Sequence, residues 1–284
     1  MAKALVAFYP LAGRLRVDSD GQLEKDCNAE GALFVVAQIE EAIHPPPPHI
    51  EPASIVLGIK VAFLRCGGVA LGTVLHHSAI DTISAMHFLQ TWSAFCWDGD
   101  AAVVELPCHD RTLLRACSPH VIDLDTVSMF SKGRGFCEPS EPNNTKVFPI
   151  SNEQLTVLKQ ICSGASTFSV VSALMWQCAC IARQLPLDAQ TCVSVPVNIH
   201  HLLRPPLPAR YFGNAVIVVS ATAAAKDIMA GTLATIATRI MGTIDRLDDK
   251  LLRSAIDYYN EMVAGMSSRP AKGNLPDTDL MMVS

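Results

Sequence analysis

The sequence predicts an α/β protein, because two kinds of apolar pattern interleave along its 284 residues. Segments in the first third alternate apolar and polar residues with the period of a β-strand, whereas several later segments repeat apolar residues at helical spacing. Half of the residues are apolar, so a chain of this length can bury the core of one large domain or of two ordinary ones.

The first third of the chain is predicted to be mainly strands and short turns. Residues 15–17, 22–24 and 32–37 form short strand-like runs, and the proline run at 44–48 predicts a loop. A β-hairpin is expected next, because residues 55–63 alternate strictly, a Cys-Gly-Gly turn follows, and 69–75 form a second apolar run.

The predicted hairpin leads directly into the sequence HHSAID at residues 76–81. After Asp81 the apolar period changes, since Ile83, Met86 and Leu89 recur at helical spacing. The two histidines are therefore expected at the end of a strand, next to the N-terminus of a helix, which is a common place for functional residues.

Domain organisation follows from a change in composition near residue 117. We expect an N-terminal domain at 1–117, a crossover rich in Ser, Gly, Pro and Asn at 118–148, and a C-terminal domain at 149–284. The second domain opens with a capping-box pattern at 151–154. Helices are predicted at 169–183 and from 227 onward, with a buried strand at 214–221 between them.

Composition excludes several classes of function. The net charge of −5 without an obvious basic face gives no reason to expect nucleic acid or an anionic membrane as a partner. No apolar run reaches the roughly 18 residues of a membrane-spanning helix, and the first residues lack the layout of a secretory signal, so we expect a cytoplasmic protein. The ten cysteines are scattered, and Cys178 and Cys180 lack the partners that zinc spacing requires, so no metal site is predicted.

His77 and Asp81 allow two interpretations from the residues alone. A histidine at a strand end can be a hydrogen-bonded core residue or a proton-transfer group, and an aspartate before a helix can be an N-cap as well as a functional partner. The chain contains no Gly-x-Ser-x-Gly motif, no Gly-rich phosphate loop and no His-Glu-x-x-His motif. A nucleophilic cysteine stays open, although nothing singles out one of the ten.

A family resemblance becomes specific at HHSAID, whose His-x-x-x-Asp spacing resembles the signature of the plant BAHD acyl-CoA-dependent acyltransferases. Further stretches resemble the family in the same order along almost the whole chain. These are KALVAFYPLAGRL (3–15), DCNAEGALFVVA (26–37), DRTLLRA (110–116), TFSVVSALMWQCAC (167–180) and LRPPLPARYFGNA (203–215). The resemblance is strongest to the hydroxycinnamoyl-CoA branch.

The resemblance implies a two-domain fold similar to chloramphenicol acetyltransferase, with acyl-CoA as co-substrate, no bound cofactor and a monomeric state. It implies that His77 is the general base and that Asp81, facing away from substrate, fixes the loop that carries the histidine. Tyr211, Phe212, Gly213 and Asn214 allow two interpretations, an ordinary strand entry or a substrate-binding segment, and we predict the second.

The chain departs from the family pattern at two internal positions and at its ends. His200 stands where the family generally has the arginine that pairs with the buried aspartate, and Thr82 stands where a glycine is common. The chain starts at a segment that in the family follows an N-terminal strand and a further helix, and the Asp-Phe-Gly-Trp-Gly motif of the family's C-terminal part is missing. We therefore expect a fold that is incomplete at both termini.

The function predicted from these resemblances is transfer of a hydroxycinnamoyl group from CoA to an amine or an alcohol. The candidate amines are putrescine, agmatine and polyamines, and the candidate alcohols are shikimate and quinate. The alternative is a catalytically impaired, truncated paralogue that at most binds acyl-CoA or a homologue.

Overall fold

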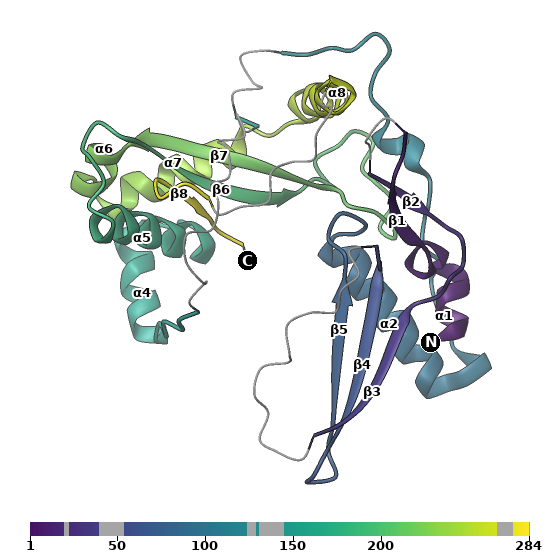
Figure 1. Ribbon diagram of the computed structural model, residues 1–284. Helices are drawn as coiled ribbons and strands as arrows, with labels where there is room; N and C mark the ends of the chain where they lie inside the picture. Colours follow the sequence, from purple (N-terminus) through teal and green to yellow (C-terminus); the bar gives the residue numbers. More distant parts are fainter. Residues whose placement is uncertain (20–22, 40–53, 124–128, 131–144, 266–274, 284) are drawn as a thin grey trace. The chain divides into compact units, whose positions relative to one another are not determined.

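The computed structural model describes residues 1–19, 23–39, 54–123, 129–130, 145–265 and 275–283 (Figure 1). The chain divides into two compact units. The first contains Met1–Leu113 and Leu207–Ala215, and the second contains Leu114–Pro206, Val216–Gly265 and the described residues after 270. Each unit is described by itself.

The first unit combines helical turns with two small sheets. Its helical segments and strands follow in the order α1 (Ala2–Ala7), the 3₁₀ turn η1 (Tyr9–Ala12), β1 (Arg14–Val17), β2 (Leu23–Asp26), β3 (Leu33–Ile39), β4 (Leu57–Leu64), β5 (Val69–Leu75), α2 (Thr82–Asp98), η2 (Gly99–Ala101) and η3 (Arg111–Leu114).

Strand pairing in the first unit confirms the predicted hairpin. β4 and β5 pair antiparallel, with Phe63 opposite Val69 next to the turn, and β3 lies parallel to β4 on its other side. β1 and β2 form a separate antiparallel pair. The strict alternation along β4 places Leu57 and Ile59 on the same face, where both are fully buried.

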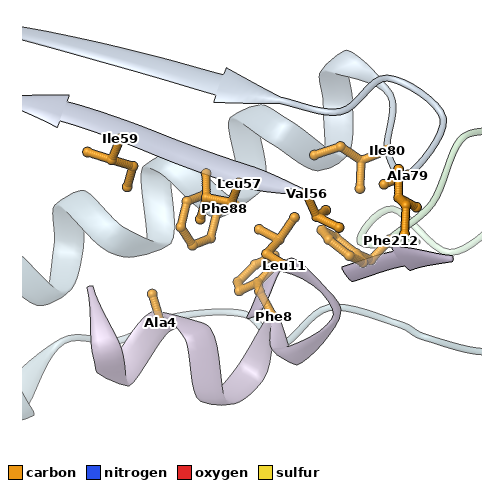
Figure 2. Packing of buried hydrophobic residues seen from close by; sticks show 11 residues of the cluster. Ala4, Phe8, Leu11, Val56, Leu57, Ile59, Ala79, Ile80, Phe88 and Phe212 are labelled. Carbon is orange, nitrogen blue, oxygen red and sulfur yellow. The ribbon is translucent and has the colours of Figure 1, made fainter. Parts of the chain in front are cut away.

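The core of the first unit lies between β4 and the helices α1 and α2. Figure 2 shows Phe88 beside Leu57 and Phe8 next to Leu11, with Phe212 on the side of the cluster toward Ala79. The rings of Phe8 and Phe212 meet edge to face, with centroids 5.3 Å apart. A residue from the 207–215 segment therefore completes a core that is otherwise built from the first 90 residues.

The second unit is a three-stranded sheet with helices. Its sheet order is β7-β6-β8, in which β6 and β7 pair antiparallel and β6 and β8 pair parallel. Its elements are α4 (Asn152–Ile161), α5 (Thr167–Ala182), β6 (Gln190–Asn198), β7 (Val216–Ala224), α6 (Ala225–Ala230), α7 (Leu233–Asp245), α8 (Asp249–Gly265) and β8 (Asp279–Met281).

Local capping signals explain where the helices of the second unit begin. The predicted capping box is present, since the Ser151 hydroxyl accepts from the Gln154 N–H and the Gln154 side chain accepts from the Ser151 N–H. The apolar stripe predicted from residue 227 onward is not one continuous helix, because it is divided between α6 and α7, and α8 follows them. Thr232 caps α7, and a Cβ at Gly231 would lie 2.5 Å from the Asp227 carbonyl oxygen.

Three further features differ from the expectations or lie outside the described residues. The short helix α1 and the strand β6 were not predicted. Leu207–Ala215 belongs to the first unit rather than to the domain expected at 149–284, because hydrogen bonds tie it to α2. The proline loop at 44–48 and most of the crossover at 118–148 lie outside the described residues.

Among the described residues, no helix has both the length and the apolar character needed to cross a bilayer.

Candidate active site

His77 lies on the loop that joins β5 to α2, as the change of period predicted. The loop is anchored by the buried residues Ala79 and Ile80, which point into the same core as Phe212 (Figure 2). The His76 N–H donates to the Val56 carbonyl at 2.9 Å, and the Ala79 N–H donates to the His76 carbonyl at 2.9 Å. His77 itself is exposed, so a loop whose C-terminal half is buried presents an accessible imidazole.

Asp81 is almost fully buried and is the N-cap of α2. Its Oδ1 accepts from the Ser84 N–H at 2.8 Å, and its Oδ2 accepts from the Ala215 N–H at 3.0 Å. Its own N–H donates to the Gly213 carbonyl at 2.8 Å. The carboxylate thus makes charge-assisted hydrogen bonds to backbone N–H groups at a helix N-terminus. Both oxygens are occupied by backbone groups.

Ser84 is a site residue that the sequence reasoning missed. Its hydroxyl oxygen accepts from the Gly213 N–H at 3.0 Å and donates to the Gly213 carbonyl at 2.9 Å. The residue is buried one turn after Asp81, so both side chains face the same segment. The sequence signal for Ser84 is its position three residues after Asp81. Serine is too common at this position of a helix for that spacing to identify a site residue.

The segment from Tyr211 to Asn214 packs directly against the histidine loop. Asn214 is exposed and its Nδ2 donates to the His77 carbonyl at 2.8 Å. A Cβ at Gly213 would lie 2.3 Å from Nη1 of Arg111 and 2.7 Å from Cε1 of Tyr211, so only glycine fits without rearrangement. Gly213 therefore lets the backbone of this segment lie close to Arg111 and Tyr211.

Tyr211 and Phe212 are core residues of the first unit. Tyr211 is 3% exposed and Phe212 is fully buried. Arg111 lies over the Tyr211 ring, 5.7 Å from its centroid, and donates to its hydroxyl at 3.4 Å. Burial favours a structural role for these two side chains over the substrate contact predicted for them.

His200 belongs to the second unit and is 2% exposed. It follows β6, and its backbone N–H donates to the Asn198 Oδ1 at 2.9 Å. Its pairing with Asp81, expected from the family resemblance, joins residues of different units and stays a prediction.

The neighbouring histidine, His76, is distinguished from His77 by its surroundings. It is half-buried, and its Nδ1 accepts from the Ser78 N–H at 3.3 Å. Burial, followed by the proximity of His77, lowers the pKa of His76 below its ordinary value, so it is neutral near pH 7. Across the described part of the chain, no group of three or more His, Cys, Asp or Glu side chains is arranged to hold a metal ion.

Solved structures first define the class of fold. The crystal structure of vinorine synthase matches with a TM-score of 0.67 at 20% identity, covering 99% of this chain and 68% of that one. TRI101 of F. sporotrichioides, solved with coenzyme A and T-2, matches with a TM-score of 0.72 at 15% identity, covering 99% and 73%. At these identities the likeness shows the fold alone, and it confirms the predicted α/β acyltransferase fold.

The chain belongs to the Transferase family, whose model matches residues 1–44 and 48–284. Putrescine hydroxycinnamoyltransferase 1 of Oryza sativa subsp. japonica is 38% identical over 318 aligned residues, covering 100% of this chain and 71% of that protein. Shikimate O-hydroxycinnamoyltransferase of Nicotiana tabacum is 30% identical, covering 91% and 66%.

A third relative acts, by its name, on an aromatic amine. It is the hydroxycinnamoyl-CoA:5-hydroxyanthranilate N-hydroxycinnamoyltransferase HHT4 of Avena sativa, which is 34% identical and covers 91% of this chain and 65% of that protein. These relatives confirm the predicted hydroxycinnamoyl branch of the BAHD acyltransferases, enzymes that use a CoA thioester as co-substrate. The chain spans about two thirds of the length of the relatives it matches.

Proposed function

We propose that this chain transfers a hydroxycinnamoyl group from a CoA thioester to a small amine or alcohol, with His77 as the general base. The observation that carries the proposal is the exposed imidazole of His77 on a loop whose backbone is fixed. Asn214 holds the His77 carbonyl, and Asp81 ties the end of the loop to Ala215. A base on a fixed loop can meet the geometric demands of proton transfer.

The proposed reaction needs no covalent enzyme intermediate. Neutral His77 takes the proton from the acceptor O–H or N–H while that oxygen or nitrogen attacks the thioester carbonyl carbon. The new C–O or C–N bond gives a tetrahedral intermediate, which collapses by breaking the C–S bond. The departing CoA thiolate then takes the proton from the imidazolium, so free CoA leaves and the neutral histidine is restored.

Asp81 acts in this proposal as a positioning residue. Both of its carboxylate oxygens accept from backbone N–H groups, those of Ser84 and Ala215. The carboxylate is therefore engaged by the protein rather than directed at a substrate. Its effect on transfer runs through the geometry of the loop that carries His77.

The acceptor that we favour is an aliphatic diamine such as putrescine. The rice relative named for putrescine is 38% identical across the full chain, whereas the tobacco relative named for shikimate is 30% identical across 91% of it. An aliphatic amine is mostly protonated near pH 7, with a pKa of about 10 as for lysine. Turnover with putrescine should therefore rise with pH more steeply than turnover with shikimate.

The test measures acyl transfer from coumaroyl-CoA to putrescine and to shikimate separately, with products identified by mass spectrometry. His77→Ala is compared with His201→Ala, which removes an exposed histidine of the second unit. We expect His77→Ala to abolish turnover while its circular dichroism and unfolding transition match those of the natural chain. Equal turnover in both variants would rule out His77 as the base.

A second candidate function is binding of acyl-CoA without turnover. The observation that favours it is His200, which stands where the family resemblance leads us to expect an arginine. Histidine lacks the guanidinium fork and carries only a partial charge near neutrality, so it is a weaker partner for a buried carboxylate. Calorimetric binding of coumaroyl-CoA by a folded chain that shows no product would support this candidate.

A further inference from the structure

Lys25 is a half-buried lysine that reaches the histidine loop from β2. Its Nζ donates to the Ala79 carbonyl at 3.0 Å and lies 5.7 Å from the centroid of the Phe212 ring. Ala79 is two residues after His77 and only 3% exposed. The ammonium group thus supports, from a strand 54 residues away in sequence, the loop that presents the histidine.

Side chains from two separate segments hold the carbonyl groups of this loop. The His77 carbonyl accepts from Asn214, and the Ala79 carbonyl accepts from Lys25. The loop N–H groups of His76 and Ala79 are instead satisfied by backbone carbonyls. Loss of the Asn214 side chain would leave the His77 carbonyl without this hydrogen bond, and loss of the Lys25 side chain would do the same to the Ala79 carbonyl two residues later. In either case the loop that carries His77 would be less well fixed.

The ammonium of Lys25 is costly to keep in this environment. Burial, and then the charge of Arg111, lower the pKa of Lys25 from 10.5 to about 8. The titratable groups that interact with it are Arg111, His109 and Cys27, and no described carboxylate forms an ion pair with it. An apolar side chain would avoid the desolvation of the charge, so packing alone does not explain a lysine here.

We propose that Lys25 is a positioning residue for His77, because its hydrogen bond to the Ala79 carbonyl fixes the loop in the orientation needed for proton transfer. The inference rests on the proposed acyl-transfer function. The role of Lys25 differs from the roles of Asp81 and Asn214, because Lys25 contacts the middle of the loop and brings a charged donor from another element. A charged donor makes a stronger hydrogen bond to a carbonyl than a neutral donor does.

Three variants test the inference. Lys25→Met keeps the apolar stem and removes the donor, whereas Lys25→Arg keeps a charged donor. Lys60→Met makes the same chemical change on β4, on the opposite strand face from Ile59. Each variant is measured for kcat, KM, free energy of unfolding, and hydrogen exchange of the amides of residues 76–81.

We expect Lys25→Met to lower kcat about 10- to 100-fold with KM nearly unchanged, as for a small misplacement of a reacting group. Its free energy of unfolding should be equal to or higher than that of the natural chain, and the Ala79 and Asp81 amides should exchange faster. Lys25→Arg should recover most of kcat, and Lys60→Met should change none of these quantities.

Two results would overturn the inference. One is an unchanged kcat in folded Lys25→Met, and the other is unchanged exchange at residues 76–81. If the natural chain has no turnover, the acyl-transfer proposal fails by itself, while the exchange measurement still decides whether Lys25 fixes the loop.

Discussion

The carboxylate of Asp81 accepts a hydrogen bond from the backbone N–H of Ala215 at 3.0 Å, across 134 residues of sequence. Its second oxygen caps α2 through the Ser84 N–H. One buried side chain therefore starts a helix and holds a distant segment against it. The cap predicted from the sequence is present, and the same side chain makes a long-range contact that the cap alone does not require.

Replacing Asp81 by asparagine should destabilise the first unit. An amide has one acceptor oxygen, so its NH₂ group would face either the Ser84 or the Ala215 N–H. The expected loss in free energy of unfolding is about 1–3 kcal/mol, the cost of a buried donor without a partner. Urea denaturation measures it, with Asp98→Asn at the exposed C-terminal end of α2 as the control. An equal stability of the two variants would contradict this reading of the contacts.

Replacing Ser84 by alanine tests the clamp on Gly213. The Gly213 carbonyl would keep the Asp81 N–H as a donor, but the Gly213 N–H would lose its acceptor. We expect a loss of about 1–3 kcal/mol in the free energy of unfolding. Ser93→Ala, at an exposed position of the same helix, should leave stability within about 0.5 kcal/mol of the natural chain.

Adding a methyl group at Gly213 should be costly for a steric reason. The new Cβ would contact the end of the Arg111 side chain, which can swing away, and the ring of buried Tyr211, which has little room to move. Gly213→Ala should therefore lose roughly 1–3 kcal/mol, as expected of overpacking. Combining it with Arg111→Ala should recover only part of the loss, because the Tyr211 contact remains. Full recovery in the double variant would place the whole clash at Arg111.

Lys25 should give stability a measurable pH dependence. Its pKa is lowered to about 8 in the folded chain, against 10.5 for an ordinary lysine, so between these values the unfolded chain binds more protons. Stability attributable to this group should therefore rise with pH across that window and be lowest below pH 8. Urea denaturation of the natural chain and of Lys25→Met at pH 7, 8, 9 and 10 isolates the effect. A constant difference between the two would show that the group does not titrate in this range.

Turnover should respond to pH in the opposite direction from this stability. With shikimate as acceptor, deprotonation of Lys25 above about pH 8 weakens the bond to the Ala79 carbonyl, so kcat should fall. Lys25→Arg keeps its proton at these pH values and should lack this decrease. A decrease of the same size in Lys25→Arg would assign it to another group.

Local sequence patterns predicted the surroundings of His77 well. The period-two run of β5 and the helical period after Asp81 depend only on neighbouring residues, so the strand, loop and helix follow directly from them. The short helix α1 was not predicted, because it has six residues and no side-chain cap.

The partners of the loop could not be predicted in the same way. Ser84 meets Gly213 across 129 residues, and Asn214 meets His77 across 137. Lys25 has no sequence feature that distinguishes it from a surface lysine of a short strand. Such contacts depend on tertiary packing, which periodicity does not encode. For the same reason, periodicity does not reveal that Leu207–Ala215 packs with the first unit.

The position of Phe212 in the sequence means that the core of the first unit is completed late in synthesis of the chain. The aromatic cluster around Phe8 lacks one fully buried ring until that residue has been synthesised, and removal of a buried phenylalanine costs about 3–5 kcal/mol. During translation the N-terminal segment therefore cannot complete this cluster until about a hundred further residues have been added. Part of its apolar surface stays exposed until then. A nascent chain that has emerged only as far as Leu113 should behave as a client of chaperones rather than as a folded domain.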